Sequence, residues 1–305
     1  MSFDTPLTLR GPLRKPRQML ADQEYGGHTS IHDDATAERL GLRAGPIEGP
    51  THFSLFPPLL EKIWGQAWFE RGCISSHYLN MVVEGEAVLA FADIPPEGAT
   101  STRVWAEKED GTPVLEASAS IGPGETLLEQ RMKALRPPER LLILADLRLG
   151  MTGATDETVG MDADQHMGNL YPFSLNQKLA AITENSPWYS DASASPWGRA
   201  IIPLEMVSVL AEYSSGAARF PVKGPAVGLF ADQEIRMIDG PLFVGETYLI
   251  RREIVALAES RRTESYWVRS RIFDAAGAVQ KAEMLLNHAT LKDSYAGYAS
   301  ADAPQ

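Results

Sequence analysis

The chain has 305 residues and a formal net charge of −12 at neutral pH. Its 44% hydrophobic and 22% charged residues are typical of a globular protein, and the length suggests about two domains. The sequence lacks the basic run of a nucleic-acid binder. It also lacks the roughly 18 consecutive apolar residues of a membrane helix. Cys73 is the single cysteine, which excludes an internal disulfide, and no apolar stretch of signal-peptide length begins the chain. We therefore expect a cytoplasmic protein without nucleic-acid or membrane partners.

The two ends of the sequence differ from its body. Residues 1–20 carry four basic side chains among three prolines, which predicts an irregular N-terminal arm lying on the body of the protein. The same charges would also suit a positive lip that meets a phosphate-bearing ligand. Residues 293–305 are small and polar, and we expect them to form a flexible tail.

The first half, residues 21–122, has the pattern of a helix-plus-sheet unit. A short helix is predicted over 35–40, with Asp33 or Asp34 as its N-cap. The Gly/Pro-rich turn AGPIEGP then leads into an apolar helix over 51–69, which Pro57 and Pro58 should interrupt. Four alternating segments predict strands, with a hairpin turn at Glu109-Asp110-Gly111: ISSHYLNMVVEG, EAVLAFADI, STRVWAEKE and PVLEASASI.

The second half, residues 169–292, repeats this order after a linker, 123–168, that is partly helical. An apolar helix ending near Gly216 is followed by long strands between residues 226 and 291. Four landmark pairs lie between 153 and 166 residues apart: His32 and Tyr189, Pro50 and Pro203, Gly85 and Gly245, and Gly111 and Gly277. A nearly constant offset indicates a duplicated domain, so the predicted class is α+β with antiparallel sheet.

The motif around the first landmark carries a resemblance. The segments His28-Thr29-Ser30-Ile31-His32-Asp33-Asp34-Ala35 and Gly45-Pro46-Ile47-Glu48-Gly49-Pro50 resemble the MaoC-like dehydratases and (R)-specific enoyl-CoA hydratases. The resemblance implies a tandem (double) hotdog, in which two antiparallel sheets each wrap a central helix. It also implies that an acyl thioester lies between the two units and that no cofactor or metal is needed.

The resemblance further implies site residues in the first half. His32 matches the catalytic histidine of the family, and the Gly49 N–H matches its oxyanion donor. The family's catalytic aspartate is replaced by Gly27, so His28 is either a second titrating group or a surface loop residue. His52 begins the first central helix and is expected to face the same cavity as His32.

The second half departs from the motif in the opposite way. Glu184 supplies the carboxylate, but the histidine position holds Tyr189 and the glycine turn is Ile201-Ile202-Pro203. We interpret this half as a degenerate support unit, in which Glu184 and Tyr189 are either structural or catalytic. Glu205, in the first turn of the second central helix, is either a carboxylate that serves His32 from across the units or a residue that suits the helix dipole.

These observations predict a hydro-lyase, a hydratase or dehydratase of an α,β-unsaturated or 3-hydroxy acyl thioester bound to CoA or a carrier protein. One alternative is a hotdog enzyme repurposed for isomerisation, cyclisation or water addition on a substrate that is not a thioester. Another is a non-catalytic subunit of a hetero-oligomeric hydratase. We expect the fused pair of units to form a homodimer.

Overall fold

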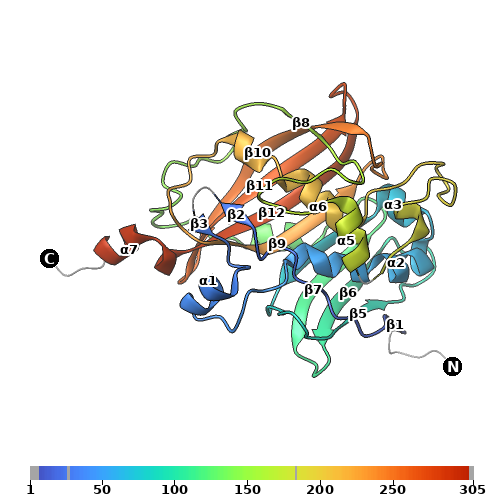
Figure 1. Cartoon of the computed structure of the whole chain (residues 1–305), viewed down its shortest axis with the longest axis horizontal. Coiled ribbons are helices and arrows are strands. Elements are labelled where there is room, and N and C mark those ends of the chain that lie inside the picture. The colour runs from blue at the N-terminus through green and yellow to red at the C-terminus, as the bar shows by residue number, and fades with distance from the viewer. Residues whose placement is uncertain (1–6, 26–27, 183, 302–305) are drawn as a thin grey trace.

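A ten-stranded antiparallel sheet dominates the computed structural model, which describes residues 7–25, 28–182 and 184–301 (Figure 1). The strands follow the order β1-β5-β6-β7-β4-β9-β12-β11-β10-β8. Read from the two edges toward the middle, the order is the same in both halves, because β1 corresponds to β8, β5 to β10, β6 to β11, β7 to β12 and β4 to β9. The sheet is therefore two copies of one five-stranded sheet joined through β4 and β9.

The first unit holds three consecutive short helices where one interrupted helix was predicted over 51–69. The break at Pro57 is confirmed, since a new helix begins there, and Gly65 (φ 59°) ends that helix. The elements are β1 (Thr8–Arg10), β2 (Glu24–Tyr25), β3 (His28–Thr29), α1 (Asp34–Arg39), the 3₁₀ helix η1 (Gly49–Leu55), α2 (Pro57–Trp64), α3 (Ala67–Arg71), β4 (Cys73–Tyr78), β5 (Val88–Asp93), β6 (Ser101–Lys108) and β7 (Pro113–Ser120).

The second unit has longer strands and one continuous central helix, α6. The expectation that this helix runs to Gly216 is wrong, because α6 ends at Glu212 and Gly216 lies in a separate 3₁₀ turn. The elements are α4 (Leu127–Lys133), β8 (Glu157–Gly160), α5 (Leu175–Ala181), η2 (Pro187–Tyr189), α6 (Leu204–Glu212), η3 (Ser215–Ala218), β9 (Gly228–Met237), β10 (Thr247–Glu259), β11 (Thr263–Asp274), β12 (Gln280–Leu291), η4 (Lys292–Ser294) and α7 (Ala296–Ala301).

The duplicated glycines lie at matching turns with matching backbone geometry. Gly85 (φ 88°) precedes β5 and Gly245 (φ 77°) precedes β10, while Gly111 (φ 85°) joins β6 to β7 and Gly277 (φ 69°) joins β11 to β12. A positive φ is open to glycine at little cost, which explains why the residue type survives at these positions when the surrounding identity is low.

The N-terminal arm and the linker each contribute an edge strand. β1 pairs with β5, and β8, inside the segment 123–168, pairs with β10. Arg14 also forms an ion pair with Glu184 in the second unit. The arm and the linker therefore lie at equivalent positions in the duplicated architecture.

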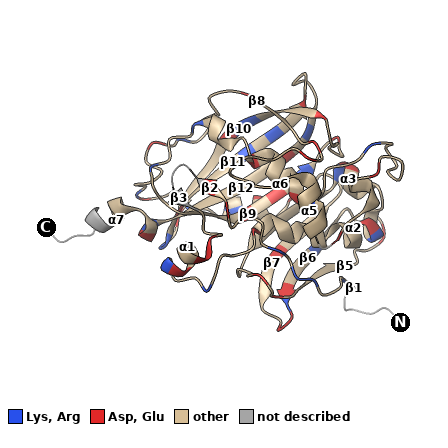
Figure 2. Ribbon diagram, in the orientation of Figure 1, with Lys and Arg blue, Asp and Glu red and all other residues tan. Residues whose placement is uncertain are grey.

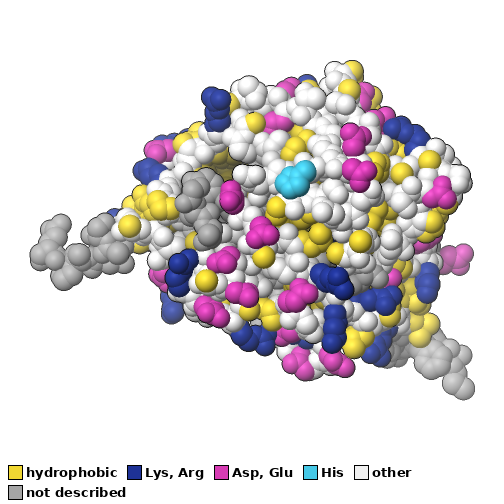
Figure 3. Space-filling model, in the orientation of Figure 1, with side chains coloured by type: hydrophobic (Ala, Val, Ile, Leu, Met, Phe, Trp, Pro, Cys, Tyr) yellow, Lys and Arg dark blue, Asp and Glu magenta, His cyan; other side chains and the backbone are white. Residues whose placement is uncertain are grey.

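The main core lies between the inner face of the sheet and the central helices, where η1 lies against α6 (Figure 1). α6 is buried on nearly all sides, from Glu205 to Glu212. The outer face of the sheet is covered in part by α4 through Leu128. It also carries the stacked rings of Phe91 and Trp105, and charged residues of both signs are interspersed on β10 and β11 (Figure 2). On the face of the molecule drawn in Figure 3, acidic and basic side chains are scattered among hydrophobic ones.

Candidate active site

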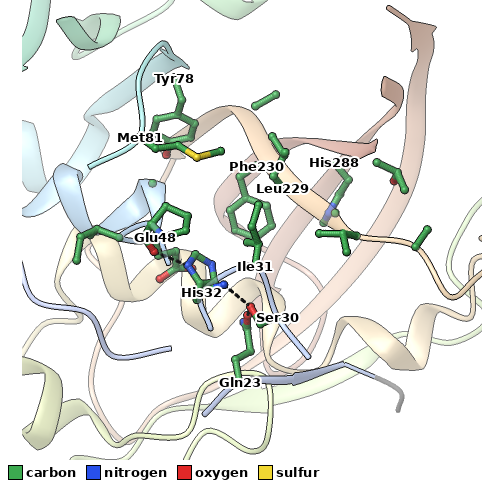
Figure 4. Close-up of a pocket in the computed structure, with 18 of the residues that line it drawn as sticks. Gln23, Ser30, Ile31, His32, Glu48, Tyr78, Met81, Leu229, Phe230 and His288 are labelled. Carbon is green, nitrogen blue, oxygen red and sulfur yellow. Dashed lines mark hydrogen bonds between the residues drawn. The ribbon is translucent and has the colours of Figure 1, made fainter. Parts of the chain in front are cut away.

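A cavity of about 430 Å³ lies where the two units meet (Figure 4). The first unit lines it with residues of the motif around His32, with the turn 46–49 and with the end of β4. The second unit lines it with the start of β9 and with inward-facing side chains of β11 and β12. This volume is within the range of small-molecule sites, which are commonly about 300–1,000 Å³.

His32 enters the cavity from the segment that precedes α1. Asp33 is the N-cap of that helix, accepting from the Thr36 N–H at 2.8 Å, and the Asp34 carboxylate accepts from the Gly45 N–H at 2.8 Å. A Cβ at Gly45 would lie 2.2 Å from the His32 carbonyl oxygen, so only glycine allows this close approach. The two aspartates of the motif therefore hold the segment that carries His32 in place.

The tautomer of His32 follows from its hydrogen bond. Nδ1 lies 2.6 Å from the Pro46 carbonyl oxygen, and because a carbonyl only accepts, Nδ1 carries the proton. Nε2 then keeps its lone pair, and none of the described residues bonds to it. Burial, with a smaller contribution from the Lys178 cation, lowers the pKa of His32 to about 4. At neutral pH His32 is an uncharged imidazole that can accept a proton.

Gly49 offers a backbone donor in the same cavity. Among the described residues its N–H donates to no acceptor, although it lines the pocket beside His32. The Tyr78 ring packs directly on Gly49, and a Cβ there would lie 2.5 Å from the ring. Tyr78 is held in turn by the bond from its hydroxyl to Gln233 Oε1 on β9, at 3.0 Å.

Glu48 also lines the cavity, and the sequence interpretation did not include it among the site residues. Figure 4 shows Glu48 next to His32 on one side of the pocket. The residue is 5% exposed, and its Oε1 has no hydrogen-bond partner among the described residues. Burial raises the pKa of this carboxyl, against the opposing effect of Lys178. The only signal in the sequence is an acid placed inside the Gly/Pro turn AGPIEGP.

Lys178 of α5 reaches across from the second unit to this site. It is 3% exposed, and its Nζ donates to Thr51 Oγ1 at 3.0 Å and lies 3.9 Å from Glu205 Oε1. One buried cation thus stands near two buried carboxylates, those of Glu48 and Glu205. Burial raises the pKa of Glu205 to about 7, although Lys178 opposes the shift. A lysine between Leu175 and Leu179 on the apolar face of a helix is the sequence signal that could have revealed it.

His52 and Glu205, two predicted binding residues, take different places. His52 lines the cavity as expected, its Nδ1 has no partner among the described residues, and burial lowers its pKa to about 4. Glu205 is 1% exposed and does not line the cavity, so the structure places it behind the site with Lys178.

Two other predicted catalytic residues, Glu184 and Tyr189, do not line the cavity. Glu184 forms an ion pair with Arg14, and Tyr189 is buried in the main core. His28 is paired through its backbone with Tyr25 in the small sheet, and its side chain is not described. Gly27 lies outside the described residues.

Three aromatic rings pack together beside the second motif. Trp188 precedes Tyr189 as Ile31 precedes His32, and it packs against Phe69 and Trp197 with centroid separations of 5.0 and 5.6 Å. The third contact, between Phe69 and Trp197, is 6.1 Å. These rings leave the duplicated architecture with an open site beside one motif and a packed core beside the other.

No group of three or more His, Cys, Asp or Glu side chains in ranges 7–25, 28–182 and 184–301 is arranged to hold a metal ion. Within the same ranges, none of the helices has the length and apolar character needed to cross a membrane.

No protein-family model matches the sequence, and no curated protein matches it significantly. In three dimensions the chain is similar to a conserved protein of Mycobacterium tuberculosis with a double-hotdog fold, with a TM-score of 0.55 and 12% identity over 95% of this chain and 97% of that one. It is also similar to a MaoC-like dehydratase, with a TM-score of 0.51 and 12% identity over 93% of this chain and 97% of that one. These likenesses confirm the predicted double-hotdog fold.

Proposed function

We propose that the protein is a hydratase or dehydratase of an acyl thioester, with its reaction centre at His32, Glu48 and Gly49. The observation that carries the proposal is that an uncharged imidazole with a free Nε2, a buried carboxyl and an unpaired backbone N–H line one cavity. Environments that lower the pKa of one titratable group and raise that of its neighbour are typical of an acid–base pair. A MaoC-like dehydratase with the same fold supports the reaction class.

The proposed chemistry assigns one role to each group. In hydration, His32 Nε2 takes a proton from water as the oxygen bonds to the β-carbon of the enoyl thioester. The electron pair of the double bond moves toward the thioester carbonyl, whose oxygen accepts a hydrogen bond from the Gly49 N–H. Protonated Glu48 then gives its proton to the α-carbon. In dehydration the same groups act in reverse, with Glu48 as base and the His32 imidazolium as acid. Glu48 in this scheme supplies the carboxyl that the motif lacks at Gly27.

Steady-state assays on crotonyl-CoA and on longer and branched enoyl-CoA thioesters test the proposal. We expect loss of the enoyl absorbance, and Glu48→Gln should lower kcat/KM by about 100-fold or more, the typical worth of a general acid–base group. The matched control is Glu184→Gln, which removes a carboxylate from the other motif and should leave kcat/KM within about twofold of the parent.

Two results would overturn the proposal. Release of free CoA thiol together with a free acid that keeps its carbon–carbon double bond would assign thioester hydrolysis to the cavity. Absence of any turnover by well-folded protein would favour a reaction on a substrate that is not a thioester, or a subunit that needs a partner chain.

A further inference from the structure

The cavity has a second wall, opposite His32, that belongs to the second unit. His288 of β12, Tyr266 of β11 and Phe230 of β9 line it together. The His288 ring stacks on Tyr266 with centroids 4.7 Å apart and an angle of 11°, and Phe230 meets the same ring edge-on at 5.5 Å and 87°. Figure 4 shows His288 beside Phe230, apart from His32 and Glu48.

A buried ion cluster lies behind His288. Arg252 Nε lies 2.7 Å from Glu157 Oε1, and Arg252 Nη1 lies 3.0 Å from Glu212 Oε1 and 2.8 Å from Ser270 Oγ. All three ionic groups are at most 5% exposed in their side chains. Because Arg252 bonds to Glu157, Glu212 and Ser270 at once, it holds the Glu212 carboxyl in place behind the His288 ring.

His288 itself is left without a hydrogen bond. Its Nε2 lies 3.8 Å from Glu212 Oε2, which is beyond hydrogen-bonding distance, and no other described residue bonds to either ring nitrogen. Its side chain is nevertheless only 19% exposed. A polar side chain that lines a cavity and has no partner among the described residues is available to a ligand.

The charges around His288 define the kind of ligand group it can bind. Burial, followed by the Arg252 cation, lowers the pKa of His288 to about 3, so the ring is uncharged and offers one donor and one acceptor. Because Arg252, Glu157 and Glu212 already pair with one another, the cluster offers no unpaired charge to a ligand ion of either sign. An uncharged hydroxyl can donate to one ring nitrogen or accept from the other, so it fits either tautomer.

We infer that the second wall selects acyl thioesters whose acyl chain carries a hydroxyl group, with His288 as its hydrogen-bond partner and with Phe230 and Tyr266 packed on the adjoining carbons. This inference takes from the proposed function only that the ligand is an acyl thioester. It concerns how the acyl chain is recognised and not the acid–base step. A site built to bond a hydroxyl disfavours the analogue without it, because the desolvated partner is then left unpaired.

Paired enoyl-CoA substrates of equal chain length, with and without an ω-hydroxyl group, test the inference. Across a series of chain lengths, we expect at least one hydroxylated member to have a kcat/KM about tenfold or more above its plain counterpart. His288→Leu should abolish this preference by lowering kcat/KM for the hydroxylated substrate about tenfold more than for the plain one. His288→Gln keeps a hydrogen-bond donor and an acceptor, so it should retain part of the preference for the hydroxylated substrate. This variant replaces His288→Leu in the test if the leucine variant does not fold.

A binding measurement separates this inference from the proposed reaction. Calorimetric titration with the saturated acyl-CoA pair needs no turnover and should show the same His288-dependent preference. If the protein turns over no enoyl thioester but binds the hydroxylated ligand more tightly, the proposed function fails and the inference stands. Equal affinity for the two ligands, failure to bind both, or an equal loss for both in His288→Leu would overturn the inference.

Discussion

The two units share the same backbone arrangement around their motifs but differ in the side chains beside it. An isolated bridge joins Pro46 to Val83 in the first unit, and an equivalent bridge joins Ile201 to Phe243 in the second. Beside the first bridge the side chains leave a cavity, whereas beside the second Trp188, Trp197 and Phe69 fill the space. The two copies thus differ in the side chains beside the motif rather than in the backbone.

The sharpest test of this difference is a matched pair of substitutions at the corresponding positions. His32→Ala should lower kcat/KM on the enoyl thioester by about 100- to 10,000-fold, since it removes the proposed general base. Tyr189→Phe, at the corresponding position of the second motif, should leave kcat/KM within about threefold. Steady-state kinetics of both variants check the prediction, and comparable losses in the two would show that both copies take part in the chemistry.

Removal of the buried Lys178 cation, which lies between the two units, is expected to lower the free energy of unfolding. Lys178→Met leaves two buried carboxyl groups without their cation and should lower the free energy of unfolding by about 3 to 5 kcal/mol. Adding Glu205→Gln should recover part of the loss, because one of the two carboxyl groups is then gone. Urea denaturation measures both effects. Lys133→Met, in an exposed ion pair with Glu125, is the control and should leave the urea midpoint close to that of the parent.

A substitution in the aromatic cluster beside the second motif is expected to lower stability without lowering activity. Trp188→Ala removes a ring from the aromatic cluster and should cost about 2 to 4 kcal/mol, since Trp188 is only partly buried. At temperatures where the variant stays folded, kcat/KM should remain within about twofold of the parent. Thermal denaturation and kinetics on one preparation check both statements. A large fall in kcat/KM with little change in Tm would show that the second motif does more than support the fold.

The raised pKa of Glu205 predicts a pH dependence of stability. Its pKa is about 7 in the folded protein against 4.5 as the ordinary value, so the folded state keeps a proton that the unfolded chain releases in this window. The stability from the protonated carboxyl is full below pH 4.5 and is lost as the pH rises to 7. Glu205→Gln should reduce this fall by on the order of 1 to 3 kcal/mol.

Urea denaturation across the same pH window measures that change. Glu212, whose pKa is also raised to about 7, should preserve the remaining slope in the variant. Glu184→Gln is the control and should keep the parental slope. An unchanged slope in Glu205→Gln would show that Glu205 does not hold a proton in the folded state.

The fold was predictable to the extent that local patterns specify it. The duplicated glycines, the strand periodicity and the proline break in the first central helix all reflect backbone requirements that neighbouring residues reveal. The end of α6 was not predictable in this way, because the helix stops without a glycine at its C-terminus, at Tyr213.

The site was predictable only where it follows the motif. His32, Gly49 and His52, which lie within one short segment around the motif, all line the cavity. Lys178 could not be placed, because its contact with Thr51 joins residues 127 positions apart in different units. Glu184 matched the motif, yet its partner Arg14 is 170 positions away and holds it out of the cavity. Long-range pairing of charges decides such cases, and no local pattern encodes it.

The pairing of β4 with β9 gives the molecule a freedom that an assembly of identical single units lacks. In a symmetric homodimer both subunits have the same sequence, so an aromatic substitution that fills one site also fills the other. Here the twofold relation is contained within one polypeptide, and each copy can diverge alone. The second unit can therefore carry Trp188 where the first carries Ile31, while His32 is present in the first unit alone. The joined sheet is in effect a heterodimer encoded as a single chain.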